Sequence, residues 1–282
     1  MSAWYRFGWI AGLTGVCLLG LLSGPPRASA YLIDLNDASV VEHGSMALEL
    51  QPLGYFQTLI GPEDHELVAP SFQLYWGLAE DWDVLYVARG YGLLDPDPGD
   101  NAYSFGEQTI AFRSVLRHGT YSSDDAEGPA IVFQGGLMLP GIGADPGFGA
   151  TAALLVSQEW DEGTLHFNVW TNLTRDPAFE LFVTAVYEGP SAWDVRPTFE
   201  AYFDLYDGEP YVSGLAGAVA DVTEDFAIQA GVRLGGWEDS LEMEVRVSSW
   251  IEWEVFDPAE PGTPAPRARP QAATLTRDTT RQ

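Results

Sequence analysis

The chain has 282 residues, and its formal net charge of -28 is strongly acidic. Such a charge excludes nucleic-acid binding as a leading function, because the phosphate backbone would repel the protein. The single cysteine, Cys17, excludes a disulfide framework and a thiolate metal cluster. Nothing in the composition divides the chain, so one large domain is the simplest organisation.

Residues 1–30 have the pattern of a signal peptide that is removed. Arg6 gives a weakly positive start, residues 9–22 are almost entirely apolar, and residues 28–30 form a small-x-small cleavage site. A retained helical anchor and a lipoprotein anchored at Cys17 are the alternatives. The apolar run is short for a membrane span, which favours the signal peptide. Residues 31–44 then form a lead-in or an inner plug, between which the sequence does not choose.

Alternating segments separated by turn-forming residues follow from Ser45 to Phe256. Gly, Pro, Asp and Asn punctuate the breaks, and no helical periodicity competes with this pattern. The number of segments is even. We expect twelve strands at 46–56, 66–78, 82–93, 103–117, 129–139, 148–159, 164–174, 178–188, 193–206, 210–220, 225–235 and 240–256.

The last segment, 240–256, shows the alternation most clearly. Every second residue from Leu241 is apolar, apart from Ser249, whereas the residues between them are mostly charged. Its length exceeds the usual strand of about five or six residues and suits a tilted strand that crosses a bilayer. A long strand in a soluble sandwich would alternate in the same way. The decision therefore rests on the repeated pattern, which recurs in 164–174, 178–188, 193–206 and 225–235.

Two features favour a membrane barrel over a sandwich. Trp and Tyr gather near segment ends, where an interfacial aromatic girdle would lie. These residues are Trp76, Trp82, Trp160, Trp193, Tyr211, Trp237 and Trp253. An even strand number also returns both chain termini to one side of the membrane, as in bacterial outer-membrane barrels. We predict an all-β fold, a transmembrane antiparallel up-and-down β-barrel of about 12 strands over 45–256, in the outer membrane of a Gram-negative bacterium.

The flanking and connecting segments fit this topology. The acidic connections near 57–65, 94–102 and 140–147 would face outward, and the tight turns would face the periplasm. The connection 118–128 is unusually long for the periplasmic side. Residues 257–282 are rich in Pro, Ala, Thr and Arg, which predicts a disordered periplasmic tail. The partners implied are outer-membrane lipid and the barrel-assembly machinery.

Three stretches resemble a known family. They are 70–83 (P-S-F-Q-L-Y-W-G-L-A-E-D-W-D), 135–140 (G-G-L-M-L-P) with Gly147 and Gly149 after it, and 166–168 (H-F-N). They are similar to the outer-membrane barrels named for the MetA pathway of phenol degradation. The resemblance covers most of 45–256. It implies a channel or transporter for hydrophobic or aromatic compounds.

The polar faces of the predicted strands identify candidate lumen-lining residues. Carboxylates outnumber guanidiniums among them, so one interpretation is a lumen that favours cations or neutral polar solutes. The other is an interlocking network of Arg and carboxylate side chains that fills and stiffens the interior. The candidates are Glu49, Glu107, Arg113, His166, Asn168, Glu180, Arg196, Glu200, Asp204, Arg233, Glu242, Glu244, Arg246, Glu252 and Glu254, with Arg89 also on a polar face.

Catalytic, metal and cofactor sites have little support. His166 and Asn168 share a polar face, but no serine is placed by the sequence beside them as a nucleophile. The four histidines lie in different elements without metal-ligand spacing. The acidic loop 95–101 lacks the closing Glu of a calcium loop. We therefore expect no enzyme activity and no cofactor.

The functional prediction is a channel or transporter for small solutes. One alternative is a non-conducting barrel with a structural or adhesive role. Another is a secreted soluble β-sandwich that binds a ligand.

Overall fold

The structure is a computed structural model that describes residues 37–61, 66–94, 96, 102–123, 126–142, 146–175, 178–223, 225–237 and 240–255. The predicted signal peptide, the tail after residue 256 and most of the acidic loop 95–101 lie outside these residues. No segment of the described chain forms a helix with the length and hydrophobicity that a membrane-spanning helix requires.

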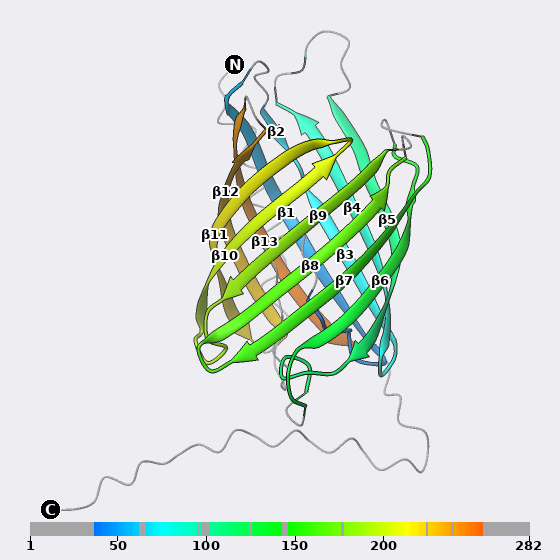
Figure 1. The fold of residues 1–282 in the computed structure, drawn as a ribbon, viewed down its shortest axis with the longest axis vertical. Coiled ribbons are helices and arrows are strands. Elements are labelled where there is room, and N and C mark those ends of the chain that lie inside the picture. The colour runs from blue at the N-terminus through cyan, green and yellow to red at the C-terminus, as the bar shows by residue number, and fades with distance from the viewer. Residues whose placement is uncertain are drawn as a thin grey trace, which may run out of the picture.

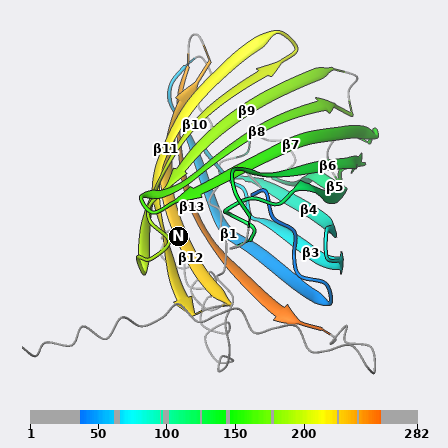
Figure 2. The same ribbon diagram turned by 60° about the horizontal axis from the view of Figure 1, so that its bottom comes forward.

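The described chain folds as one antiparallel sheet that closes on itself (Figures 1 and 2). β1 pairs with β13, and β2 and β3 share one position between β1 and β4. The barrel therefore has twelve strand positions, and the predicted fold is confirmed. The strands are β1 (Ser45–Ile60), β2 (Glu66–Val68), β3 (Ser71–Ala79), β4 (Trp82–Leu93), β5 (Tyr103–Arg117), β6 (Ala130–Leu139), β7 (Gly149–Trp160), β8 (Gly163–Leu173), β9 (Phe179–Glu188), β10 (Val195–Tyr206), β11 (Glu209–Thr223), β12 (Phe226–Gly236) and β13 (Leu241–Glu254).

The predicted segments agree with these strands within a few residues, with two differences. β1 continues to Ile60 instead of ending near residue 56. The predicted strand 66–78 is interrupted because Pro70 has no N–H to donate to a ladder. The backbone nevertheless remains hydrogen-bonded to β1 and β4 there. Ala69 N–H donates to Gly54 O at 2.6 Å, and Gly90 N–H donates to Pro70 O at 2.8 Å.

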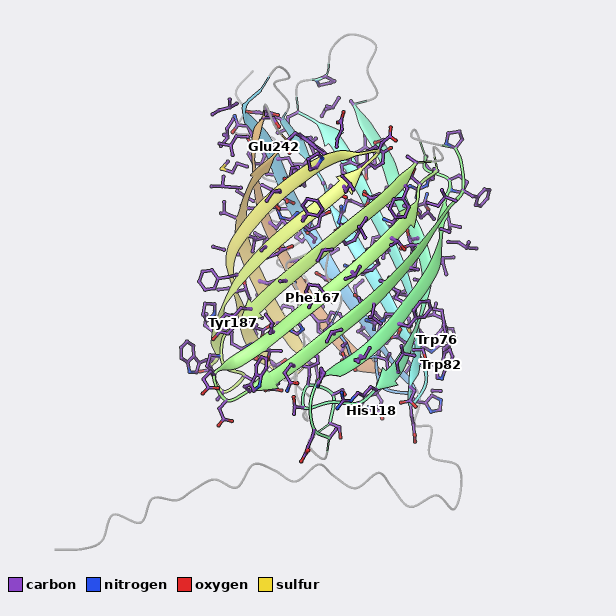
Figure 3. The ribbon with its side chains drawn as sticks, viewed as in Figure 1. Trp76, Trp82, His118, Phe167, Tyr187 and Glu242 are labelled. Carbon is purple, nitrogen blue, oxygen red and sulfur yellow. The ribbon has the colours of Figure 1, made fainter. Side chains whose placement is uncertain are left out.

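The two faces of the barrel differ in polarity, and β8 shows this best. His166, Asn168 and Asn172 are buried in the interior, whereas Phe167 and Leu173 on the opposite face are 43% and 56% exposed. Successive side chains of a strand point to opposite faces, so the sequence alternation becomes an inside and an outside. Large apolar side chains cover the outer face of the other strands too (Figure 3). Such a continuous apolar exterior is typical of strands that face lipid.

The end of the barrel where β1 begins and β13 ends is called the terminal end below. Five predicted girdle residues are exposed at this end: Trp76, Trp82, Trp160, Trp193 and Trp253. Figure 3 shows Trp76 and Trp82 at one level there. Tyr211 differs, because it shares the parity of buried Ser213 and its ring lies 6.1 Å from that of Tyr202 inside the barrel. Its predicted interfacial position is wrong.

The segment before β1, residues 37–44 and called the entering segment below, passes inside the barrel. Ala38 and Val41 are buried, and each belongs to a cluster of apolar residues on the inner wall. Gly77 of β3 lies against this segment, because an added Cβ would come within 1.9 Å of Glu42 O. The wall and the entering chain are thus in backbone contact.

The Gly77→Ala variant tests this contact. The new methyl group must push the entering segment or the wall aside, so we expect the free energy of unfolding to fall by about 1–3 kcal/mol. Urea unfolding of the barrel in micelles measures the change. Gly214→Ala is the control, because its Cβ would meet only Glu200 O at 3.6 Å. Equal stability of the two variants would contradict the described contact.

Candidate functional site in the barrel lumen

The structure places most of the predicted lumen residues in the interior. Glu107, Glu180, Glu242 and Glu252 are partly buried, and Glu254 is exposed at the terminal rim. The buried ones are Glu49, Arg113, His166, Asn168, Arg196, Glu200, Asp204, Arg233, Glu244 and Arg246.

Charged side chains from nearby strands pair along the inner wall. Arg233 of β12 lies 3.3 Å from Glu200 of β10 and 3.4 Å from Glu244 of β13. Glu244 also pairs with Arg246, and the Arg233 guanidinium lies over the Tyr202 ring at 5.2 Å. This cluster joins three strands with two guanidiniums and two carboxylates, so its charge is balanced.

A second cluster surrounds Arg196 nearer the terminal end. Its guanidinium pairs with Glu188 of β9, and its Nη2 donates to Asp221 of β11 at 3.0 Å. Glu188 and Asp221 are not among the predicted lumen residues, although both lie on inward faces. Arg89 and Glu107 form a further pair at 3.3 Å. Arg113 pairs with Asp83, so all five predicted inward Arg side chains have a carboxylate partner. This favours the interlocking network over an open acidic pore.

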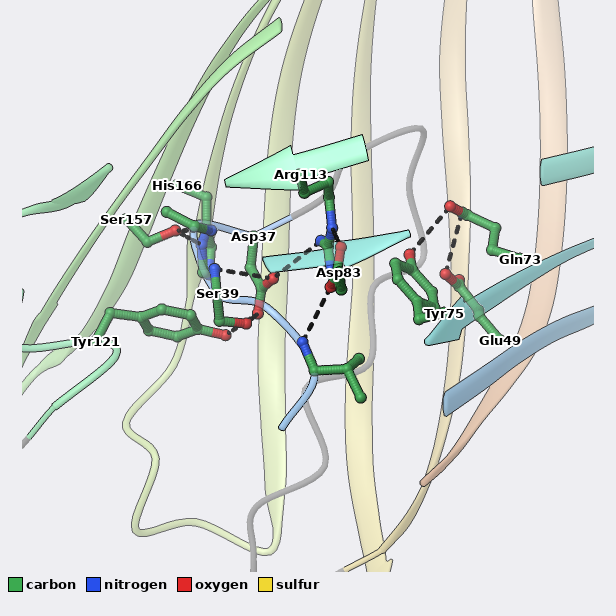
Figure 4. A network of polar contacts seen from close by, with 12 residues as sticks. Asp37, Ser39, Glu49, Gln73, Tyr75, Asp83, Arg113, Tyr121, Ser157 and His166 are labelled. Atoms are coloured by element: carbon green, nitrogen blue, oxygen red, sulfur yellow. Dashed lines mark hydrogen bonds and ion pairs between the residues drawn. The ribbon is translucent and has the colours of Figure 1, made fainter. Parts of the chain in front are cut away.

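Asp37 anchors the entering segment to the terminal half of the lumen (Figure 4). It lies 3.9 Å from Arg113, whose Nε donates to Asp83 Oδ1 at 2.8 Å. Asp83 also accepts a hydrogen bond from Val41 N–H at 3.0 Å. One buried guanidinium between two carboxylates thus ties the segment to β4 and β5.

The long connection between β5 and β6 closes over the same segment. Tyr121 donates a hydrogen bond to Asp37 Oδ2 at 2.7 Å, and its ring meets the His166 ring edge-on at 5.1 Å. Thr120 donates to Glu159 O at 3.0 Å, which holds the connection against β7. The unusual length of this connection at the terminal end therefore has a structural role, because it lets the connection reach the entering segment.

A serine does lie beside His166, although the sequence predicted none there. Ser157 Oγ is 2.8 Å from His166 Nδ1 and also accepts a hydrogen bond from Ala38 N–H at 2.9 Å. Both side chains are 0% exposed. A nucleophile needs access to its substrate, and this hydroxyl instead fixes the entering segment. The pair is structural in the described arrangement.

A cavity of about 190 Å³ lies in the lumen, and its lining residues come from the strands and not from the entering segment. Its lining comes from β3 to β10, so it spans the interior of the barrel. Trp170, Phe182 and Tyr202 form one side of it, and Gln73, Arg89 and Glu107 lie on strands across the barrel. Within the part of the chain that the structure describes, no three His, Cys, Asp or Glu side chains are grouped as metal ligands.

Comparisons with known proteins find similarity of fold only. Neither family models nor curated proteins match the sequence. A crystallised outer membrane channel from Pseudomonas putida F1 has a TM-score of 0.57 at 9% identity, covering 78% of this chain and 100% of that chain. The KdgM porin in complex with disordered oligogalacturonate gives 0.49 at 8% identity, covering 73% and 98%. The CymD monoaromatic hydrocarbon channel gives 0.44 at 9% identity, covering 83% and 94%. At such low identity, the likeness to the first of these shows a shared outer-membrane barrel fold.

Replacing Arg196 tests the buried network. Arg196→Met leaves Glu188 and Asp221 without their shared cation, so we expect the free energy of unfolding to fall by about 3 kcal/mol or more. Arg117→Met is the matched control, because Arg117 is exposed at the terminal end and donates only to Glu127 O in the described contacts. Urea unfolding in micelles compares them. A loss no larger than in the control would show that the network contributes little.

Proposed function

We propose that this protein is an outer-membrane channel for small solutes, with a preference for hydrophobic or aromatic compounds. The observation that carries the proposal is a closed barrel with an apolar outside and a cavity inside it. The aromatic side of the cavity supports the preference for ring compounds. Membership of the family named for the MetA pathway of phenol degradation is part of the same proposal.

The proposal extends to the placement of the chain. The terminal end faces the periplasm, residues 1–30 are removed as a signal peptide, and the tail after residue 256 is periplasmic. The barrel-assembly machinery inserts the strands. Residues 31–44 act as a plug, for which the contacts of Asp37, Ala38 and Val41 with the inner wall are the support.

A non-conducting structural barrel is the second candidate, and the paired lumen charges favour it. It differs from the channel in one respect, namely whether the plug ever leaves the terminal half of the lumen. The soluble β-sandwich is wrong, because one sheet closes on itself instead of two sheets stacking. Catalysis is not part of the proposal, since the Ser157–His166 pair is inaccessible.

Single-channel recording of the refolded protein in a planar bilayer tests the channel. Asp37→Ala removes the carboxylate that holds the plug to Arg113 and Tyr121, while the ladder between β1 and β13 stays intact. We expect currents that are brief in the native protein and last at least about tenfold longer in the variant, because a buried charged contact of about 1.5–3 kcal/mol is lost.

Asp194→Ala is the matched control, since Asp194 is exposed in the turn between β9 and β10 at the same end. It removes the same charge outside the lumen and should leave the current unchanged. A folded barrel that passes no current, with or without Asp37, would contradict the channel and support the structural barrel.

A further inference from the structure

The cavity in the lumen has one aromatic side, built by three neighbouring strands. Trp170 of β8 and Phe182 of β9 stack with ring centroids 5.3 Å apart and planes at 17°. Tyr202 of β10 continues the row at 5.7 Å from Phe182. Trp170 and Phe182 are largely buried, at 8% and 9% exposed, and with Tyr202 they line the cavity, so a flat ring inside it would meet an aromatic wall.

Apart from Val87 and Met138, the remaining lining of the cavity is polar, and it carries an excess of negative charge. Arg89 and Glu107 are paired, but their side chains are still 20% and 43% exposed. Tyr91 donates a hydrogen bond to Glu107 at 2.8 Å. Glu180 lies beside the rings and accepts a hydrogen bond from Asn172 at 2.5 Å. Two carboxylates against one guanidinium leave a net charge of -1 among the lining residues.

The volume is sufficient for a solute of one ring. A cavity of roughly 150 Å³ lined by apolar residues is enough to hold benzene, and this one measures about 190 Å³. A plain hydrocarbon would fill the space but would displace water from Glu107, Glu180 and Gln134 without replacing its hydrogen bonds. A ring with a polar substituent would contact the aromatic side of the cavity with its ring and the polar lining with its substituent.

We propose that this cavity is a binding subsite for a single aromatic ring bearing an ammonium or hydroxyl group, and that it discriminates against aromatic carboxylates. The ring stacks on Trp170, Phe182 and Tyr202, and the substituent reaches Glu107 or Glu180. This inference rests on the proposed channel function for the route by which the solute enters. It narrows that function to neutral or cationic ring compounds.

Saturation-transfer NMR titrations of the full chain, refolded in detergent, test the subsite. The probes are benzylamine, benzyl alcohol, benzoate, toluene and cyclohexylmethylamine. Benzylamine and benzyl alcohol should bind at least about tenfold more tightly than benzoate, because the excess carboxylate repels an anion. Cyclohexylmethylamine, which has the charge without the π-face, and toluene, which has the face without the polar group, should bind several-fold more weakly.

Two variants separate the contributions of the ring row and the carboxylate. Trp170→Leu should weaken benzylamine and benzyl alcohol by about tenfold, whereas Phe167→Leu on the outer face of the same strand should not. Glu180→Gln should weaken benzylamine by up to about fivefold and leave benzyl alcohol unchanged. This second variant keeps its shape and serves if Trp170→Leu does not fold.

Proteoliposome swelling with glycine distinguishes the two proposals. Swelling together with equal binding of all five probes would overturn the subsite and leave the channel standing. Binding that follows the predicted order without any swelling would overturn the channel and retain the subsite as a site within a closed barrel. Tighter binding of benzoate than of benzylamine would overturn the subsite in either case.

Discussion

The pairing of β1 with β13 is the constraint on which the rest of the structure depends. The two strands pair from Ser45 with Glu254 to Ile60 with Leu241, and they come from opposite ends of the sheet. A spanning sheet must close, because each unpaired backbone group in lipid costs several kcal/mol. Closure creates an inside that lipid never touches, and within the membrane only there can the strands place charged residues.

The network of ion pairs follows from placing charged side chains in this interior. A buried Arg or Glu is tolerated when a partner of opposite charge compensates its desolvation. Arg196 with Glu188 and Asp221, and Arg233 with Glu200, meet this requirement within the wall. Arg113 meets it with Asp83 and with Asp37, which lies before the first strand. The entering segment is therefore part of the electrostatic balance of the lumen.

Strand periodicity predicts which face a residue occupies, but not which residue lies across the barrel. The faces of β8 and β13 follow directly from their alternation, and the structure agrees. The pairing of Ser157 with His166 was also predictable in principle, because the tight turn at 161–162 sets the register of β7 and β8. The contact of Asp37 with Arg113 was not, because it depends on where a segment without periodicity enters the closed barrel. The same reason kept Tyr121 out of the predicted site. Asp83 differs, because it shares the inward face of β4 with Arg89 and could have been found from the strand alternation.

Amide hydrogen exchange of Ala38 and Val41 in the refolded protein tests the central claim, that a closed barrel holds its own N-terminal segment across the terminal half of the lumen. Their N–H groups donate to Ser157 Oγ and to Asp83 Oδ2 inside the barrel. The account predicts exchange that is slowed to a degree comparable with the strand amides of β4 and β7. Exchange at the rate of an unstructured peptide, in a barrel whose strand amides remain protected, would contradict it.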